Sequence, residues 1–392
     1  MNKSSIYNTL ILLPIYWLFS GMLLMSGGDK PMVAMVIISI IATLCCYGFN
    51  SAKINIKQDK FLWVILAMTA YAIFSYHYHG YSSRGLRALL CGSLFLIFLP
   101  RQLLSLKLIY AFLFIGSLCS MFMPFYYGEY LNVGRGVWPI NAIPQSTLSS
   151  AIGLAALVSA IEEKKFERYF MFMAFTFSSI AVIVSESRGL WLGHFTVSSL
   201  IFFIKYRRCL LNKKNLLISL ALLITSSIVL APVVESRIGK TQYEIQQIEQ
   251  GNFNTSIGLR LEMWMMAPQL VVDNVMFGLG SEHQQKFAEQ IKSQDVSRTL
   301  KRDKPSHYHN QYLDQLVKNG AVGLILLMLL LISPLSSLTK AKPVVRYTVG
   351  SVVLLYSIAA LTDVPFNHGQ TLLLFTILIS CIKTIRYNDT YD

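Results

Sequence analysis

Long uninterrupted runs of apolar residues dominate the chain. Runs of membrane length occur at residues 7–26, 32–49, 61–77, 86–100, 108–126, 144–161, 169–185, 191–204, 215–234, 320–338, 347–361 and 371–385. A helix of about 20 apolar residues crosses the hydrocarbon core of a bilayer. The pattern therefore predicts an all-α integral membrane protein with about 12 transmembrane helices, a few of them short.

The connections between these runs alternate in positive charge. The basic connections carry Lys53, Lys57 and Lys60; Arg101 and Lys107; Lys164, Lys165 and Arg168; Lys205, Arg207, Arg208, Lys213 and Lys214; and Lys340, Lys342 and Arg346. Short cytoplasmic loops collect lysine and arginine, so we expect both termini and these connections in the cytoplasm. The other connections then face the outer side of the membrane.

Composition supports this membrane class. The chain is 54% hydrophobic and 14% charged, with a mean hydropathy of +0.50, which excludes an ordinary soluble protein. The net charge of +14 follows from basic cytoplasmic loops. We therefore expect membrane lipids, and no nucleic acid, as the partners of this charge.

One outer connection, residues 235–319 between spans 9 and 10, is too long to be a simple loop. It contains ten Lys or Arg and ten Asp or Glu residues. The pattern predicts helices at 241–250, 258–272, 282–292 and 309–319. The second of these has an apolar face from Met263 to Val271, expected to lie on the bundle or the bilayer surface. We predict a single polytopic domain, residues 1–392, capped by this large loop.

The last predicted helix of the loop begins with a candidate base, His309. Tyr312, Leu313 and Leu316 follow it at helical spacing, and Gly320 is the expected stop. A helix N-terminus favours neutral imidazole, which can accept a proton. From these residues alone, a histidine that packs the loop against the bundle is the alternative.

Outer connections also carry several arginines and one acid close to membrane ends. These residues are Arg84, Arg87, Arg135, Arg188, Arg260 and Asp363. A guanidinium binds phosphate through two parallel hydrogen bonds, so the set indicates an anionic ligand, whereas any one arginine could instead contact lipid headgroups. His307-x-His309 and His77-x-His79 lack a third ligand at recognisable spacing, which predicts no metal and no cofactor.

At this point the chain resembles the bacterial O-antigen ligases, in the wider O-antigen ligase and polymerase superfamily. The resemblance lies in His309-Asn310, nine residues, Gly320, two residues and Gly323; in Ser187-Arg188-Gly189 at the outer end of a span; and in Gly258-Leu259-Arg260-Leu261-Glu262-Met263-Trp264 within the large loop. It extends over essentially the whole chain. It implies a GT-C-like membrane fold with a large helical periplasmic loop.

The resemblance also implies an activity in lipopolysaccharide biosynthesis. Members transfer O-antigen polysaccharide from undecaprenyl pyrophosphate to a sugar hydroxyl of lipid A-core, at the periplasmic face of the bacterial inner membrane, with inversion and without metal. It assigns His309 as the base and Arg188 and Arg260 as donor-binding residues. Arg135 is expected to join them, with support from Asn310, His307, Asp363, Arg84 and Arg87.

Three other functions remain open at this point. An O-antigen polymerase and a protein oligosaccharyltransferase of the same superfamily use the same kind of lipid-linked donor. A polysaccharide or lipid transporter belongs to a different class. Transporters place ionisable groups near the bilayer midplane, and the predicted spans are nearly free of such groups.

Overall fold

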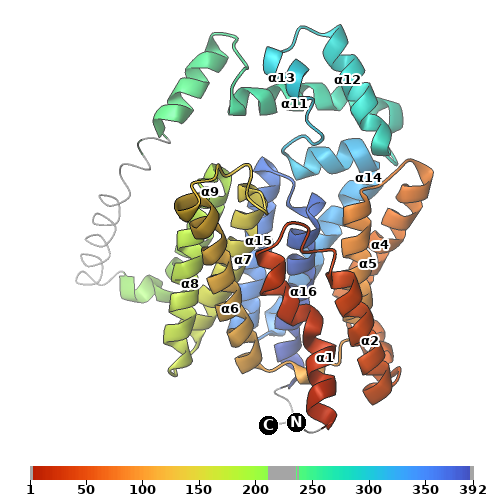
Figure 1. Cartoon of the computed structure of the whole chain (residues 1–392), viewed down its shortest axis with the longest axis vertical. Coiled ribbons are helices and arrows are strands. Elements are labelled where there is room, and N and C mark those ends of the chain that lie inside the picture. The colour runs from red at the N-terminus through yellow and green to blue at the C-terminus, as the bar shows by residue number, and fades with distance from the viewer. Residues whose placement is uncertain (1–2, 211–234, 236–237, 389–392) are drawn as a thin grey trace.

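The computed structural model describes residues 3–210, 235 and 238–388, and within these it contains helices and no β-strand (Figure 1). The main bundle is formed by α1 (Lys3–Leu18), α2 (Met32–Tyr47), α3 (Asn50–Gln58), α4 (Lys60–Tyr78), α5 (Ser83–Phe98), α6 (Leu106–Pro124), α7 (Ala142–Glu162), α8 (Glu167–Val184), α9 (Arg188–Leu210), α14 (Gln311–Ile332), α15 (Pro343–Thr362) and α16 (Gly369–Asn388). Every predicted apolar run within the described residues coincides with a helix. The ninth run, 215–234, lies outside them.

Short helical turns lie in the connections of the bundle and in the large loop. They are η1 (Gly21–Leu23), η2 (Arg101–Leu103), the π-helical η3 (Phe125–Tyr130), η4 (Val272–Asn274), η5 (Gly280–Glu282), η6 (Ser333–Lys340) and η7 (Pro365–Asn367).

The described residues contain fewer candidate membrane spans than the sequence predicts for the whole chain. Among the described residues, six helices are long and apolar enough to cross a membrane, or up to eight if two bent helix pairs each form one span. One pair bends by 50° between Ser5–Ile11 and Leu13–Leu23, and the other by 106° between α2 and α3. Other apolar runs form short helices, such as the 16-residue α5. The protein is a multi-pass membrane protein, but the expected count of about 12 spans is not confirmed.

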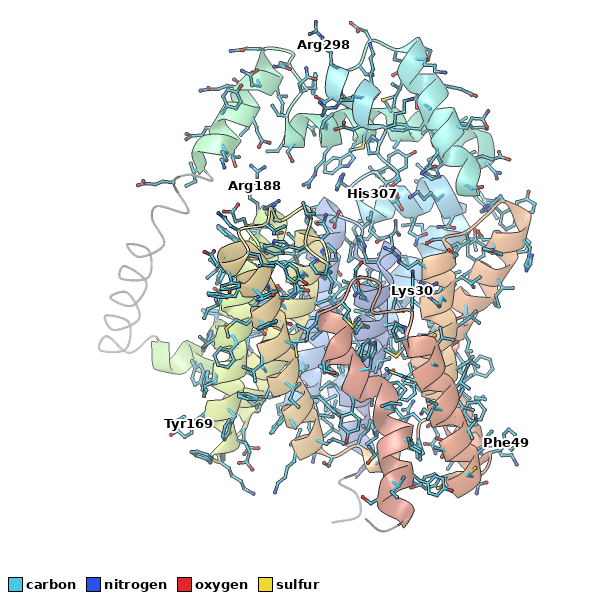
Figure 2. All side chains as sticks on the ribbon, viewed as in Figure 1. Lys30, Phe49, Tyr169, Arg188, Arg298 and His307 are labelled. Carbon is cyan, nitrogen blue, oxygen red and sulfur yellow. The ribbon has the colours of Figure 1, made fainter. Side chains whose placement is uncertain are left out.

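The predicted inner and outer connections lie at opposite ends of the bundle. Figure 2 shows Phe49 and Tyr169, beside predicted cytoplasmic connections, at one end. Arg188, from a predicted outer connection, lies at the other end; His307 lies where the cap meets the bundle, and Lys30 lies in the half of the bundle nearer the cap. Helix α1 begins and α16 ends far from the cap (Figure 1). The alternation of charge along the sequence therefore corresponds to two ends of one structure.

Helix α7 is the centre of the bundle. Of its most apolar 18-residue window, 94% is buried, and it packs against α6, α8, α9 and α15. Its sequence is rich in Ala, Ser and Gly, and such small residues let neighbouring helix backbones approach closely. The close packing around α7 gives the outer loops a rigid base.

The large loop forms a cap with a hydrophobic cluster of its own. It contains a helix at residues 238–249, α11 (Ser256–Val271), α12 (His283–Ser293) and α13 (Arg298–Asp303), followed by the first part of α14. Met263, Met266 and Leu270 of α11 pack against a complementary apolar set that includes Phe287 and Ile291 of α12. The expectation that this face of α11 lies on the bundle or the bilayer is therefore wrong, because the cap supplies its own apolar partners.

Helix α14 joins the cap to the bundle through a break at Gly320. Gly320 has φ +63° and ψ −165°, so a loop helix ends there and a membrane helix continues from it, as the sequence predicts. The backbone of residues 275–279 crosses the break: the N–H of Ala321 donates to Val275 O (2.8 Å), and the N–H of Leu279 donates to Val317 O (2.8 Å). A Cβ at Gly320 would lie 2.3 Å from Met276 O, so only glycine permits this crossing.

Candidate functional site

The candidate base lies just before the loop helix rather than on it. Helix α14 begins at Gln311, and Asn310 is its N-cap, with a side-chain oxygen that accepts from the N–H groups of Tyr312 and Leu313 (3.1 Å each). His309 has φ +47°, a left-handed conformation that is uncommon for a non-glycine residue and marks local strain. The prediction that His309 opens the helix is wrong, because asparagine is the better cap.

His309 is held by an acid from a distant part of the chain. Its Nδ1 lies 3.1 Å from Oδ1 of Asp363, which follows α15 and is 4% exposed. Burial raises the pKa of Asp363, but the His309 hydrogen bond and the charges of His309, His368 and His307 together lower it below its usual range. An ionised carboxylate can only accept, so the proton resides on Nδ1 and the Nε2 lone pair of His309 is free to take another.

His307 lies beside this pair. The rings of His307 and His309 are 4.2 Å apart between centroids, nearly edge to face. Burial, with a smaller contribution from His309, lowers the pKa of His307 to about 4. Its Nδ1 is buried and has no hydrogen-bond partner among the described residues. His307 is therefore neutral near neutral pH and has an unused polar atom.

The same three residues could provide ligands for a metal ion. One donor atom each from His307, His309 and Asp363 lie within 4.8 Å of one another. The sequence could not indicate this third ligand, because Asp363 is 54 residues from His309. A metal on His309 Nδ1 would have to displace the proton shared with Asp363. The expectation of a metal-free site remains a prediction.

Three of the predicted arginines gather near this centre. The pKa of Arg260, on α11 of the cap, is lowered by burial; its charged neighbours are, in order of effect, Asp363, Arg188, Glu244 and Arg135. The cap and two outer connections of the bundle therefore bring guanidinium groups within electrostatic reach of Arg260. Arg260 makes no hydrogen bond to the part of the chain that the structure describes, so its five donors are available to a ligand.

The other two arginines of this group already have partners. Arg188, at the start of α9, donates to Thr241 Oγ1 (2.9 Å) and Glu244 Oε1 (2.9 Å). Glu244 also accepts from the N–H of Ile257, three residues before Arg260. Arg135 donates to the carbonyl oxygens of Ser185 (3.1 Å) and Glu186 (2.9 Å) and so lies against the turn that precedes Arg188. Glu244 is not among the site residues predicted from the sequence, because no local motif marks it.

Arg84 and Arg87 lie elsewhere. Arg87 forms a 2.6 Å ion pair with Asp29, in the connection after α1. Arg84 is exposed and lines a separate cavity. The structure therefore does not bring these two residues to the arginine group around Arg260. Their expected supporting role stays a prediction.

A network around the buried Asp314 fixes the loop helix to the segment after Asp363. Asp314 accepts from Lys318 Nζ (2.8 Å) and Asn367 Nδ2 (2.6 Å). Gln311 Nε2 donates to Asn367 Oδ1 (2.9 Å), and Gln311 Oε1 accepts from the N–H of Phe366 (2.8 Å). These bonds hold His309 against Asp363. Asp314 is not among the site residues predicted from the sequence, since a pairing over more than fifty residues leaves no local pattern.

The fold and the site together define a multi-pass, all-helical membrane protein with a histidine–aspartate pair and an arginine group between its cap and its bundle. Residues 173–328 match the family model described as O-antigen ligase. The match covers less than half of the chain and supports membership of the O-antigen ligase superfamily, whose members are glycosyltransferase-like enzymes. The matched region includes Arg188, Arg260 and His309, but neither Arg135 nor Asp363.

The chain is also similar to a protein of Haemophilus influenzae (strain ATCC 51907 / DSM 11121 / KW20 / Rd) described as "Uncharacterized protein". The two are 33% identical over 173 residues, which is 42% of this chain and 42% of the relative. The similarity therefore spans less than half of the relative's length. Its description adds no activity.

Proposed function

We propose that this protein is a metal-independent O-antigen ligase of the bacterial inner membrane. It transfers O-antigen polysaccharide from undecaprenyl pyrophosphate to a sugar hydroxyl of lipid A-core, with its site facing the periplasm and both termini in the cytoplasm. The observation that carries the proposal is the hydrogen-bonded His309–Asp363 pair beside the arginines grouped around Arg260. The match of residues 173–328 to the O-antigen ligase family model supports the choice of substrates.

His309 acts as the general base. Asp363 holds the proton on Nδ1, so Nε2 takes the proton of the acceptor hydroxyl as its oxygen attacks the anomeric carbon of the donor sugar. The new glycosidic C–O bond forms as the bond from the anomeric carbon to the pyrophosphate oxygen breaks. Both electrons of that bond leave with undecaprenyl pyrophosphate, and a single displacement inverts the anomeric configuration.

The arginines stabilise the charge that develops on the leaving pyrophosphate. Arg260 has unused donors, and Arg188 and Arg135 add positive charge within electrostatic reach of it. Such groups are most effective when they are held in place before the reaction. The ion pair of Arg188 with Glu244 (2.9 Å) and the backbone contacts of Arg135 supply this positioning.

The base assignment is tested by His309→Ala. We expect the variant to reach the membrane and to lose transfer, measured as lipopolysaccharide that lacks O-antigen. His77→Ala, at an exposed outer histidine, is the matched control and should retain transfer. Near-normal smooth lipopolysaccharide from His309→Ala would refute the assignment.

The pyrophosphate assignment is tested by Arg188→Lys and Arg260→Lys. A lysine keeps the charge but loses the planar fork, so both variants should be badly impaired in transfer from the lipid-linked donor. Arg298→Lys, at an exposed position on the cap (Figure 2), is the control. Free substitution by lysine at both site positions would contradict the assignment.

The alternatives predict different products in a deletion strain. Polymer that accumulates on the lipid carrier, with an unmodified core, supports the ligase. A core that bears a single repeat unit would instead indicate a polymerase, and loss of glycan from protein would indicate an oligosaccharyltransferase. Transfer by the purified protein in detergent, without any gradient, separates all of these enzymes from a transporter.

A further inference from the structure

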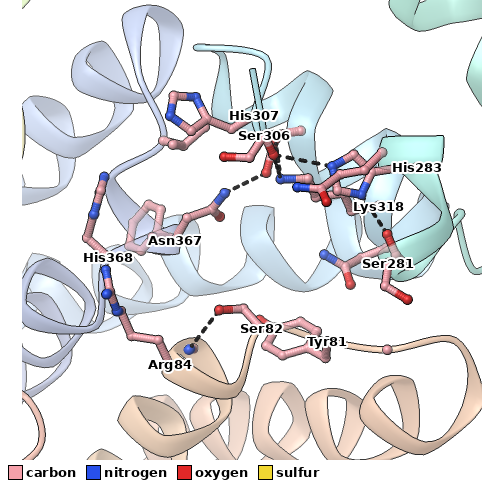
Figure 3. A pocket seen from close by; sticks show the side chains of 18 residues that line it. Tyr81, Ser82, Arg84, Ser281, His283, Ser306, His307, Lys318, Asn367 and His368 are labelled. Atoms are coloured by element: carbon pink, nitrogen blue, oxygen red, sulfur yellow. Dashed lines mark hydrogen bonds and ion pairs between the residues drawn. The ribbon is translucent and has the colours of Figure 1, made fainter. Parts of the chain in front are cut away.

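A cavity of about 410 Å³ lies beside His307, whose ring contacts that of His309; we call these two residues the histidine pair. Four segments line it: residues 80–85 at the start of α5, residues 280–284 at the start of α12, residues 306–319 with the loop part of α14, and residues 364–368. Figure 3 shows His307 and Ser306 across the cavity from Ser82 and Arg84, with His368 and Asn367 on one side and His283 and Lys318 on the other. The volume is that of a pocket for a small ligand.

The lining provides hydrogen-bonding groups with little net charge. Burial lowers the pKa of His283, His307 and His368, so their rings are neutral near neutral pH. Lys318 is neutralised by Asp314 at 2.8 Å. Neutral imidazoles, amides and hydroxyls suit a ligand rich in hydroxyl groups.

One guanidinium, that of Arg84, adds its charge to this lining. The arginine group around Arg260 offers three guanidiniums, none of which lines the cavity. A pyrophosphate with its negative charges is therefore better matched at the arginine group. The cavity suits a ligand of a different chemistry.

The histidine pair lies between the cavity and the arginine group around Arg260. His307 lines the cavity, and its ring is 4.2 Å from that of His309. Asp363, which holds His309, is next in the chain to Val364, another lining residue. On the other side, Asp363 is the first charged neighbour of Arg260. A saccharide in the cavity can therefore place a hydroxyl at the edge of the histidine pair while the pyrophosphate stays with the arginines.

We propose that this cavity binds the terminal sugars of the acceptor, and that His307 positions the acceptor hydroxyl toward His309. The inference rests on the proposed function and extends it by separating the acceptor site from the donor site. His307 is a positioning residue in this scheme, since it lines the cavity and its ring lies 4.2 Å from that of His309.

A photo-crosslinking experiment tests the location. Gln284 and Gln285 are adjacent exposed residues of α12, and only Gln284 lines the cavity. Each is replaced in turn by benzoylphenylalanine in the full-length protein, which is then irradiated with lipopolysaccharide that lacks O-antigen. We expect labelling at position 284 to exceed that at 285 by about tenfold, because only position 284 faces the cavity. Equal labelling, no labelling, or preferential labelling at 284 by undecaprenyl pyrophosphate would overturn the proposal.

A kinetic comparison provides a second measurement. Gln284→Trp should raise the KM for lipid A-core by about tenfold while the KM for the donor stays within about twofold, because the indole fills the acceptor site alone. Gln285→Trp should change neither constant. If both variants behave alike, or if the donor KM rises with Gln284→Trp, the cavity is not the acceptor site.

The two proposals fail in distinguishable ways. Labelling at position 284 by lipid A-core, together with no transfer to lipid A-core by the wild-type protein, would leave the cavity assignment intact and refute the ligase. Transfer by the wild type, without selective labelling at position 284, would refute the cavity assignment and leave the ligase intact.

Discussion

Asp363→Asn is the change that tests the proposed site most directly. The substitution keeps the size of the side chain and removes the charge that His309 Nδ1 meets at 3.1 Å. A hydrogen bond to a charged group contributes about 1.5–3 kcal/mol. At about 1.4 kcal/mol per tenfold in rate, its loss lowers kcat by about 10- to 150-fold.

The amide that replaces the carboxylate can also reverse the tautomer of the base. If its NH₂ group faces His309, it donates to Nδ1 and leaves the proton on Nε2, where no base function remains. This effect adds to the loss of charge, so the lower figure of about tenfold is the minimum expected.

The assay measures transfer of polymer from undecaprenyl pyrophosphate to lipid A-core by purified protein, with both substrates varied. Asp295→Asn is the matched control, since Asp295 is fully exposed on the cap. A thermal unfolding curve for each variant separates misfolding from loss of catalysis. A folded Asp363→Asn protein with kcat within about twofold of wild type would refute the proposal that Asp363 orients His309 as the base.

Three further predictions follow from the same geometry. Folded His307 stays neutral down to about pH 4, because its pKa is lowered to about 4, whereas an unfolded imidazole has a pKa near 6.5. Acid therefore favours the unfolded state between these pH values. In denaturant titrations, the free energy of unfolding should fall more between pH 6.5 and pH 4 for the wild type than for His307→Asn, and equal losses would contradict this. Gly320→Ala should destabilise the protein by more than about 2 kcal/mol through its positive φ and the contact with Met276 O. Gly350→Ala, where a Cβ meets nothing within 4 Å, should leave the melting temperature nearly unchanged, and equal shifts in the two variants would count against the proposed strain. Transfer should survive EDTA; its loss, with recovery on adding a divalent cation, would make His307, His309 and Asp363 metal ligands.

The sequence alone determined the properties that depend on local pattern. Apolar runs of membrane length predict where the helices lie, because a bilayer selects for continuous apolar surface. The alternation of basic connections predicts which connections share an end of the bundle. Gly320 predicts the break in α14, since a residue without Cβ is needed where another backbone crosses. The resemblance to the ligase superfamily predicts Arg188, Arg260 and His309 as site residues.

The tertiary structure decided which of these residues meet, because contacts between distant segments leave no periodic pattern in the sequence. It separated Arg87, which pairs with Asp29, from the group around Arg260. It also bent or shortened several predicted spans, because helix length in a packed bundle depends on neighbouring helices as well as on hydropathy. The pairing of His309 with Asp363 depends on cap and bundle being packed together, and only the folded chain brings them within hydrogen-bond distance.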